Sequence, residues 1–204
     1  MIENLISFSI ASALLALSPG PDNIYVIAQS LANGTKSGIA TTIGLVSGCI
    51  VHTTLLAFGV SVIITSSENL FYGIKIFGAI YLLYLAYKVY LSDHKISLTN
   101  KAPKKTNFQL FKQGVIMNII NPKVMVFFLA FFPGFLWDET QNTAAQFYIL
   151  GITFMSVAFV VFSSLAILAG SVSNYLLNHK STGLILKWLQ IVVFIGIAVF
   201  ISIP

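Results

Sequence analysis

The chain consists mainly of long apolar stretches separated by short polar ones. Each long stretch has about 18 residues or more, which is enough for a helix to cross a hydrocarbon core of roughly 30 Å. Six stretches can be placed, and they cover residues 4–31, 37–65, 70–91, 108–136, 143–172 and 183–203. The pattern predicts an all-α integral membrane protein with six transmembrane helices.

Two of these stretches, the first and the fourth, are interrupted by proline. The interruptions are formed by Ser18, Pro19, Gly20 and Pro21, and by Asn121 and Pro122. Proline lacks a backbone donor and clashes with the preceding turn, so each stretch is expected to form two half-helices. Pro21 and Pro122 suit the first turn of a restarting helix, and Asn121 is a good N-cap. Irregular backbone at membrane depth is tolerated only against protein or a wet cavity.

Charged residues separate the connections into two classes. The net charge of +5 comes from eleven lysines, no arginine and six acids. Lysines lie in the first, third and fifth connections, above all in the segment 92–107, whereas Glu68, Asp138 and Glu139 lie in the second and fourth. Lys75 is the one exception. The positive-inside rule therefore predicts that the basic segment is cytoplasmic and that both termini lie outside.

The basic segment 92–107 divides the chain into a first repeat, residues 1–91, and a second repeat, residues 108–204. Because three spans are an odd number, the second half enters the membrane from the opposite side. Each half begins with a broken span, and breaks at matching positions of inverted halves indicate the binding site of a secondary transporter. We expect a single transporter domain of two inverted three-helix repeats, with a six-helix bundle without repeats as the alternative.

The first break carries Asp22 and Asn23. An ionised aspartate near the middle of the bilayer costs on the order of 3 kcal/mol or more, so its presence requires a reason. Three roles are open: it binds the ammonium group of a substrate, it carries a proton in a coupling cycle, or it only caps the half-helix and pairs with Lys123. The spacing of Asp22, Tyr25 and Gln29 places them on one helix face, which lines a path or faces a partner helix.

The second break adds Asn118, Asn121 and Lys123. The two asparagines share a helix face with Gly114. Lys123 is the only lysine well inside this span, and its open roles are to hold a substrate carboxylate, to pair with Asp22, or to extend toward a water-filled vestibule.

A third candidate face lies in the second span. Ala40, Gly44, Gly48 and His52 recur every four residues. The glycines predict close packing of another helix. His52 is interpreted either as a proton carrier, because its ordinary pKa lies near neutrality, or as a neutral side chain that hydrogen-bonds between helices.

Composition excludes several classes of function. The chain is 57% hydrophobic and 8% charged, against roughly 25% charged residues in soluble domains. The lysines form no basic stripe, so nucleic-acid binding is not expected. The lone Cys49 is interpreted as a small packing residue. No pattern predicts a metal site, a cofactor or an enzyme, because metal-ligand spacing, a phosphate-binding loop and a nucleophile elbow are all missing from the sequence.

The motifs resemble those of the lysine exporter superfamily, and within it the homoserine/threonine-type amino-acid exporters. The matching segments are Ser18–Asn23, Gly44–His52, Gly78–Leu85, Gly114–Lys123 and Phe131–Pro133. They follow one another in the family's order and spacing, so the resemblance covers nearly the whole chain.

This resemblance implies a bacterial inner-membrane carrier that exports amino acids in exchange for protons and forms a homodimer. It assigns the transport site to Pro19, Gly20, Pro21, Asp22, Asn23, Asn118, Asn121, Pro122 and Lys123. Some relatives carry an acid in the fifth span where this chain reads Met155–Phe159. Its absence favours a neutral substrate, such as threonine, homoserine or a leucine-like amino acid, over lysine. The alternatives are another small solute, a metal ion, or a passive channel.

Overall fold

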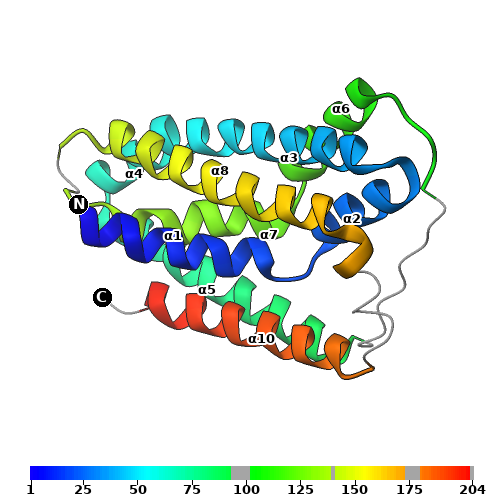
Figure 1. The fold of residues 1–204 in the computed structure, drawn as a ribbon. Coiled ribbons are helices and arrows are strands. Elements are labelled where there is room, and N and C mark those ends of the chain that lie inside the picture. Colours follow the sequence, from blue (N-terminus) through cyan, green and yellow to red (C-terminus); the bar gives the residue numbers. More distant parts are fainter. Residues whose placement is uncertain (93–101, 139–140, 173–179, 203–204) are drawn as a thin grey trace.

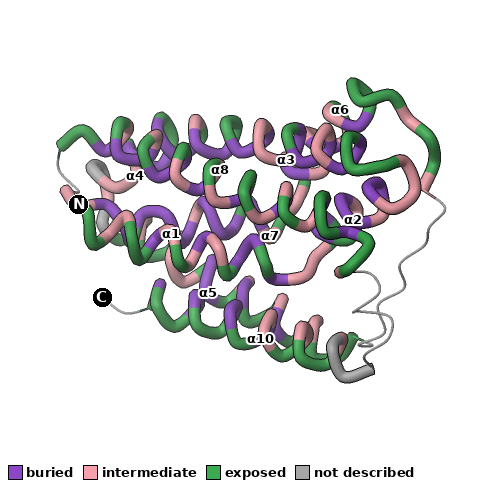
Figure 2. The backbone as a smooth tube through the Cα atoms, in the orientation of Figure 1, coloured by how far each residue is buried: buried purple, intermediate pink, exposed green. Residues whose placement is uncertain are grey.

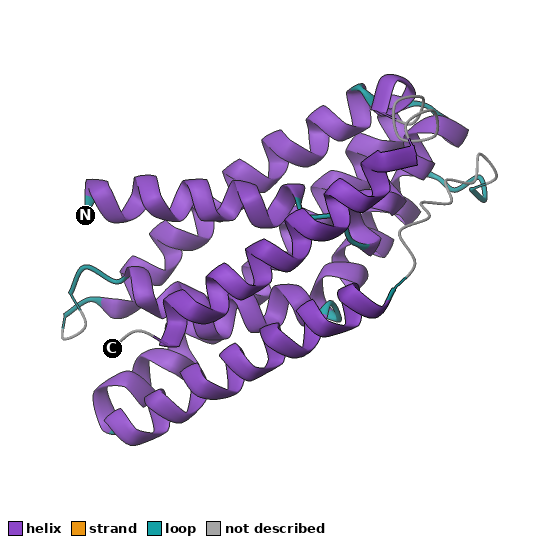
Figure 3. Cartoon of the chain, turned by 90° about the horizontal axis from the view of Figure 1, so that it is seen from below, coloured by secondary structure: helices purple, strands orange, loops and turns teal. Residues whose placement is uncertain are grey.

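The computed structural model describes residues 1–92, 102–138, 141–172 and 180–202, and this part of the chain contains helices and loops but no strand (Figures 1 and 3). The helices are α1 (Ile2–Leu17), α2 (Pro21–Asn33), α3 (Thr35–Leu55), α4 (Ser61–Ser66), α5 (Glu68–Leu91), α6 (Asn107–Ile119), α7 (Pro122–Val126), α8 (Thr143–Ile167) and α10 (Lys180–Ser202). Three irregular helical turns complete the spans: η1 (Leu56–Val60), η2 (Phe127–Phe131) and η3 (Phe132–Phe135).

The described helices provide up to six membrane crossings. Four of them, Thr35–Ile64, Asn69–Leu91, Thr143–Ile167 and Gly183–Ser202, are long and apolar enough to cross a membrane as they stand. The other two are bent pairs: α1 with α2, at 62°, and α6 with the helical segment Pro122–Phe135, at 51°. The predicted all-α membrane fold with about six spans and two broken helices is thus confirmed.

The helices lie in three layers, with α1, α2 and α7 of the broken spans in the middle and α6 against α3 (Figure 1). On one side, α3 and α8 pack against each other and cover α6, α1 and α2. On the other side, α5 pairs with α10 and contacts α7 and η2. Continuous helices therefore pack against one side of each break and bury Ser18, Asp22 and Asn118, whereas Pro21, Ile120 and Pro122 stay exposed.

Equivalent helices of the two predicted halves make matching contacts. The second span of each half packs on the broken span of the other half, as α3 does on α6 and α8 does on α1. The two second spans, α3 and α8, pack on each other, and so do the two third spans, α5 and α10. Figure 1 shows the first broken span running away from the end that holds Met1 and the second running back toward it. These contacts are the ones that two inverted repeats would make, although the division into repeats itself stays a prediction.

The two ends of the bundle differ in charge. Met1 and the last turn of α10 lie at one end, which we call the terminal end (Figure 1). The junction of α2 and α3 lies at the opposite, basic end, where Gly34 joins the helices with a φ of 87° that favours glycine. Lys36 and Lys88 also lie there. Residues 93–101 of the predicted basic segment, with two of its lysines, and Glu139 at the other end lie outside the described residues.

Exposed residues follow the outer faces of the helices (Figure 2), and many of them are large and apolar. Large apolar residues of α5 and α10, such as Ile80, Tyr87, Ile185 and Val192, are more than half exposed. A water-soluble protein rarely exposes so much contiguous apolar surface. This surface faces the lipid of a multi-pass membrane protein.

The turns η1 and η2 are π-helical, which the apolar pattern alone does not predict. Each lies inside a membrane span, and η2 directly follows the short half-helix α7. A π-helical turn is wider than an α-helical one and is often found at functional sites. Here η2 directs Phe127, Phe128 and Phe131 into the core, where all three are buried.

Glycines allow α3 and α6 to approach closely. A Cβ atom built on Gly44 would collide with the backbone of Phe111, and one on Gly114 would lie 2.5 Å from the Thr41 carbonyl oxygen. A Cβ on Gly48 would lie 2.8 Å from the side chain of Asn118. The glycine face of α3 therefore sets how near Asn118 lies to the centre of the bundle.

Replacing Gly44 with alanine is expected to lower the stability of the fold, because the new methyl group meets backbone that cannot move aside. Overpacking of this kind typically costs about 1–3 kcal/mol. Gly59→Ala is the matched control, since a Cβ at Gly59 meets nothing within 4 Å. Thermal unfolding in detergent micelles measures both, and equal midpoints for the two variants would contradict the packing described here.

Candidate functional site

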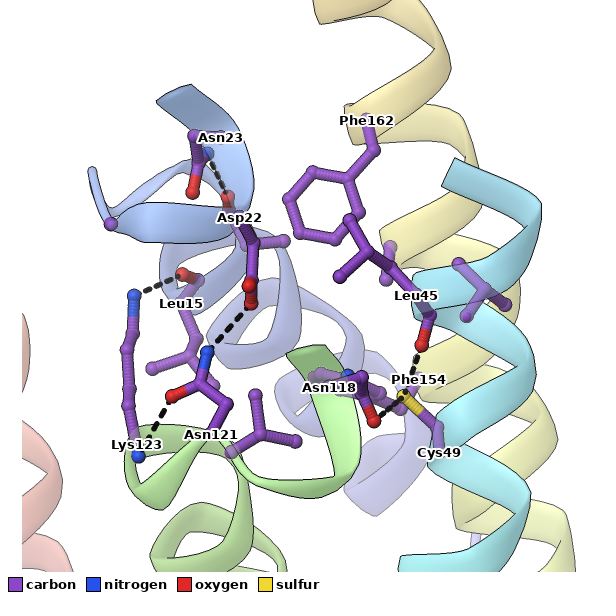
Figure 4. Close-up of a pocket in the computed structure, with 15 residues that line it drawn as sticks. Leu15, Asp22, Asn23, Leu45, Cys49, Asn118, Asn121, Lys123, Phe154 and Phe162 are labelled. Atoms are coloured by element: carbon purple, nitrogen blue, oxygen red, sulfur yellow. Dashed lines mark hydrogen bonds between the residues drawn. The ribbon is translucent and has the colours of Figure 1, made fainter. Parts of the chain in front are cut away.

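A small cavity lies where the two breaks face α3 and α8 (Figure 4). Its volume of about 20 Å³ gives room for about one water molecule. Its polar lining comes from Asp22, Asn23, Asn118, Asn121 and Lys123. The structure thus brings together residues of both predicted breaks at one point inside the bundle.

The first break ends α1 at Leu17 and restarts with Pro21 at the first position of α2. Ser18 closes α1 by donating its backbone N–H to two carbonyls of the last turn. The Asn23 side chain folds back, and its Nδ2 donates to the carbonyl oxygen of Ala16 at 2.8 Å. A side chain of the second half-helix therefore satisfies a carbonyl that the break left without an intrahelical partner.

The second break is organised by Asn121. Its Oδ1 accepts the backbone N–H of Lys123 at 3.0 Å, so it caps α7 with Pro122 in the first position. Its Nδ2 donates to Oδ2 of Asp22 at 2.7 Å. One amide thus starts the second half-helix and holds the buried carboxylate of the first break (Figure 4).

Lys123 reaches in the opposite direction, from the second break to the end of α1. Its Nζ donates to the carbonyl oxygens of Leu15 at 3.2 Å and of Ser18 at 3.0 Å. It also lies 5.6 Å from the ring centroid of Phe194 on α10. A cation near the C-terminus of a helix is favourable, because the exposed carbonyls carry partial negative charge. The two breaks therefore hold each other through Asn121 and Lys123.

Asn118 connects this site to α3. Its Oδ1 lies 3.7 Å from Sγ of Cys49, and its backbone carbonyl lies 3.3 Å from Nε2 of His52. His52 is buried beside the cavity, with its ring 5.3 Å from that of Phe128 between centroids. Cys49 lines the cavity. No sequence pattern indicated that Cys49 lines a cavity, although it lies about one helical turn before His52.

Tyr25 and Gln29 lie apart from this cavity. Gln29 is fully buried, and its Oε1 accepts a hydrogen bond from Asn33 at 2.8 Å. Tyr25 lines a second cavity of about 730 Å³ together with Pro103 and other residues. The predicted stripe of Asp22, Tyr25 and Gln29 therefore does not line a single cavity.

We call this second cavity, lined by Pro19, Gly20, Pro21, Ile24, Tyr25, Ala28, Ala102, Pro103, Met117 and Gln190, the vestibule. It lies between the first break and the basic end, because its walls are formed by α2 and by Ala102 and Pro103, which precede α6. Among the described residues, Gly20 alone lines both the vestibule and the small cavity. The two cavities therefore approach each other at the extended backbone of Gly20.

Phenylalanine rings pack together beyond the small cavity, toward the terminal end, and one of them, Phe154, lines the cavity. We call this set, Phe8, Phe127, Phe128, Phe132 and Phe154, the phenylalanine cluster. The ring centroids of Phe128 and Phe132 are 4.1 Å apart, and those of Phe128 and Phe154 are 5.1 Å apart. All five rings are buried. The dense phenylalanine content of residues 127–135 was the available signal in the sequence.

The described residues were compared with the ligand sets that bind metal ions. Across the residues that the structure describes, no three or more His, Cys, Asp or Glu side chains gather into a group that could hold a metal ion.

Comparison with known proteins gives consistent similarities. The model of the LysE type translocator family matches residues 13–203. The homoserine/homoserine lactone efflux protein of Salmonella typhimurium is 32% identical over 174 residues, which cover 85% of this chain and 84% of that protein. The leucine efflux protein of Salmonella choleraesuis is 28% identical over 202 residues, 97% of this chain and 93% of that protein. No solved structure matches the chain.

Truncation of Asn121 to alanine is expected to destabilise the fold by two separate losses. The helix cap contributes about 0.5–2 kcal/mol, and a hydrogen bond to a charged group contributes about 1.5–3 kcal/mol. Asn121→Ser keeps the cap, but its shorter side chain does not extend to Asp22 as the Asn121 Nδ2 does, so it should recover only the contribution of the cap. Thermal unfolding in micelles ranks the three proteins. Indistinguishable midpoints would show that the contact between Asn121 and Asp22 carries no stability.

Proposed function

Because the chain belongs to the LysE type translocator family, we propose that it is a secondary transporter that exports small neutral amino acids from the cytoplasm. The observation that carries this proposal is the cavity at the junction of the two breaks, with one acid and one base in its lining. The names of the relatives support the substrate class, since two of them are called efflux proteins for homoserine and its lactone or for leucine.

The charges of the cavity complement those of an amino acid. Asp22 is suited to the substrate ammonium, and Lys123 with the free N–H groups of the first turn of α2 is suited to the carboxylate. Within the described lining, these are the only charged side chains. The cavity is therefore neutral overall, as a zwitterion with an uncharged side chain is.

The present shape of the cavity corresponds to a closed state. With room for about one water molecule, it is several times smaller than an amino acid. Substrate binding thus requires α3 and α8 to move away from the breaks. The substrate ammonium would then replace the Asn121 amide at Asp22, which now accepts that hydrogen bond at 2.7 Å.

Asp22 also offers a simple route to exchange with protons. It is the only acid among the described residues that line the cavity. One carboxylate cannot hold a proton and form an ion pair with an ammonium at the same time, so the two ligands compete for it. Competition of two ligands for one site that opens alternately to either side is sufficient for antiport.

The orientation follows from the lysines. The basic end is assigned to the cytoplasm of a bacterial cell and the terminal end to the outside of its inner membrane. The vestibule then opens toward the cytoplasm, where the exported amino acid is taken up, and the phenylalanine cluster faces the outside.

Transport by the purified protein in liposomes tests the proposal. Efflux of internal threonine, homoserine or leucine should accelerate when the external solution is made acidic. Asp22→Asn should slow efflux by about tenfold or more, because a charge-assisted contact to the ammonium is lost. The control is Glu3→Gln, which changes an exposed acid in α1. No efflux of any amino acid tested, or unchanged efflux by Asp22→Asn, would refute the assignment.

Cys49 supplies an independent binding assay, because it is the only cysteine of the chain and lines the cavity. Its alkylation by a maleimide should become about tenfold slower when the substrate is present at about ten times its dissociation constant. Lysine, whose side chain is charged, should not protect. Equal alkylation rates with and without every amino acid would place the substrate elsewhere.

A further inference from the structure

The small cavity has a polar side and an apolar side. Asp22, Asn121 and Lys123 come from the breaks and form the polar side. The opposite wall is formed by α8 and α3, which contribute Phe154, Ala158 and Phe162, and Leu45, Val46 and Cys49. An amino acid whose ammonium and carboxylate are held at the breaks would therefore direct its side chain toward the wall of α3 and α8.

Phe154, Ala158 and Phe162 form the α8 part of this wall. They are spaced four residues apart, so they project from one face of the helix on successive turns. Their exposed fractions are 4%, 1% and 8%. Because a methyl group lies between two large rings, we expect the wall to be lowest at Ala158, and we call this position the recess.

Figure 4 shows how these rings are placed. The Phe162 ring extends from α8 toward the half-helix that carries Asp22, and Phe154 lies on the side of Cys49 and Asn118. Phe154 also belongs to the phenylalanine cluster, with its ring 5.1 Å from that of Phe128 between centroids. One end of the recess is thus fixed by the packed cluster, while Phe162 bounds the other end near the carboxylate.

We propose that Phe154, Ala158 and Phe162 form the subsite that selects the substrate by its side chain, with Ala158 setting its depth and Phe162 its upper size limit. The subsite rests on the proposed function. It takes amino acids with a short or branched uncharged side chain. A charged side chain buried against this wall would lose its hydration without a partner.

The neighbouring Phe159 provides a matched comparison on the same helix. It is 41% exposed and does not line the cavity, so its ring faces the lipid side of α8. Removal of the Phe159 ring takes away as much aromatic volume as removal of the Phe162 ring, but at a place where no substrate passes.

The test measures the relative transport efficiency for alanine, threonine, leucine and phenylalanine in liposomes. Ala158→Leu fills the recess and should reduce the ratio of leucine to alanine by about tenfold or more, since a few methylene groups of pocket space discriminate by that much. Phe162→Ala should raise the ratio of phenylalanine to leucine by a similar factor. Phe159→Ala should leave both ratios as in the wild type.

Ala158→Gly covers the case in which the leucine variant does not fold. It removes only a methyl group and should shift selectivity in the opposite direction, toward larger side chains. The subsite is wrong if the wild type transports these amino acids and Ala158→Gly and Phe162→Ala have the same efficiency ratios as the wild type. Phe159→Ala is expected to have those ratios in either case. A wild-type protein that moves none of the four amino acids would instead refute the proposed function, and the subsite with it.

Discussion

A helix that is broken inside a membrane releases carbonyl groups that lipid cannot satisfy. In this protein the donors come from across the break or from the other broken span: Asn23 serves Ala16, and Lys123 serves Leu15 and Ser18. The second break is therefore needed to stabilise the first. The Asn121 amide also donates to Asp22, so the second break supplies the donors of every polar contact described here between the two broken spans.

This mutual support determines where the polar chemistry lies. Donors and acceptors that would be costly in lipid are gathered between two layers of continuous helices, one with α3 and α8 and the other with α5 and α10. The close contact of α3 with α6, made possible by glycines, brings Asn118 and Cys49 to the edge of the same cavity. The groups that satisfy the backbone are thus also the groups that a zwitterion would meet.

The features that depend on local sequence could be predicted. Proline breaks a helix wherever it lies, and an apolar stretch of sufficient length crosses the bilayer, so the spans and the half-helix starts at Pro21 and Pro122 followed from the chain alone. The carbonyl partners of Lys123 could not be predicted. They lie more than a hundred residues away along the chain, and a sequence does not show which distant groups come together in space. Similarly, Tyr25 shares a helix face with Asp22, but that face passes from one cavity to another within one turn.

The unequal walls of the small cavity have an electrical consequence. It shares Gly20 in its lining with the vestibule, whereas the packed phenylalanine cluster lies between it and the terminal end. An electric field falls across insulating material, so most of the membrane potential would drop across the rings. A single charge that crosses them would experience about 2.3 kcal/mol per 100 mV, while a zwitterion, which has no net charge, would cross without that electrical work.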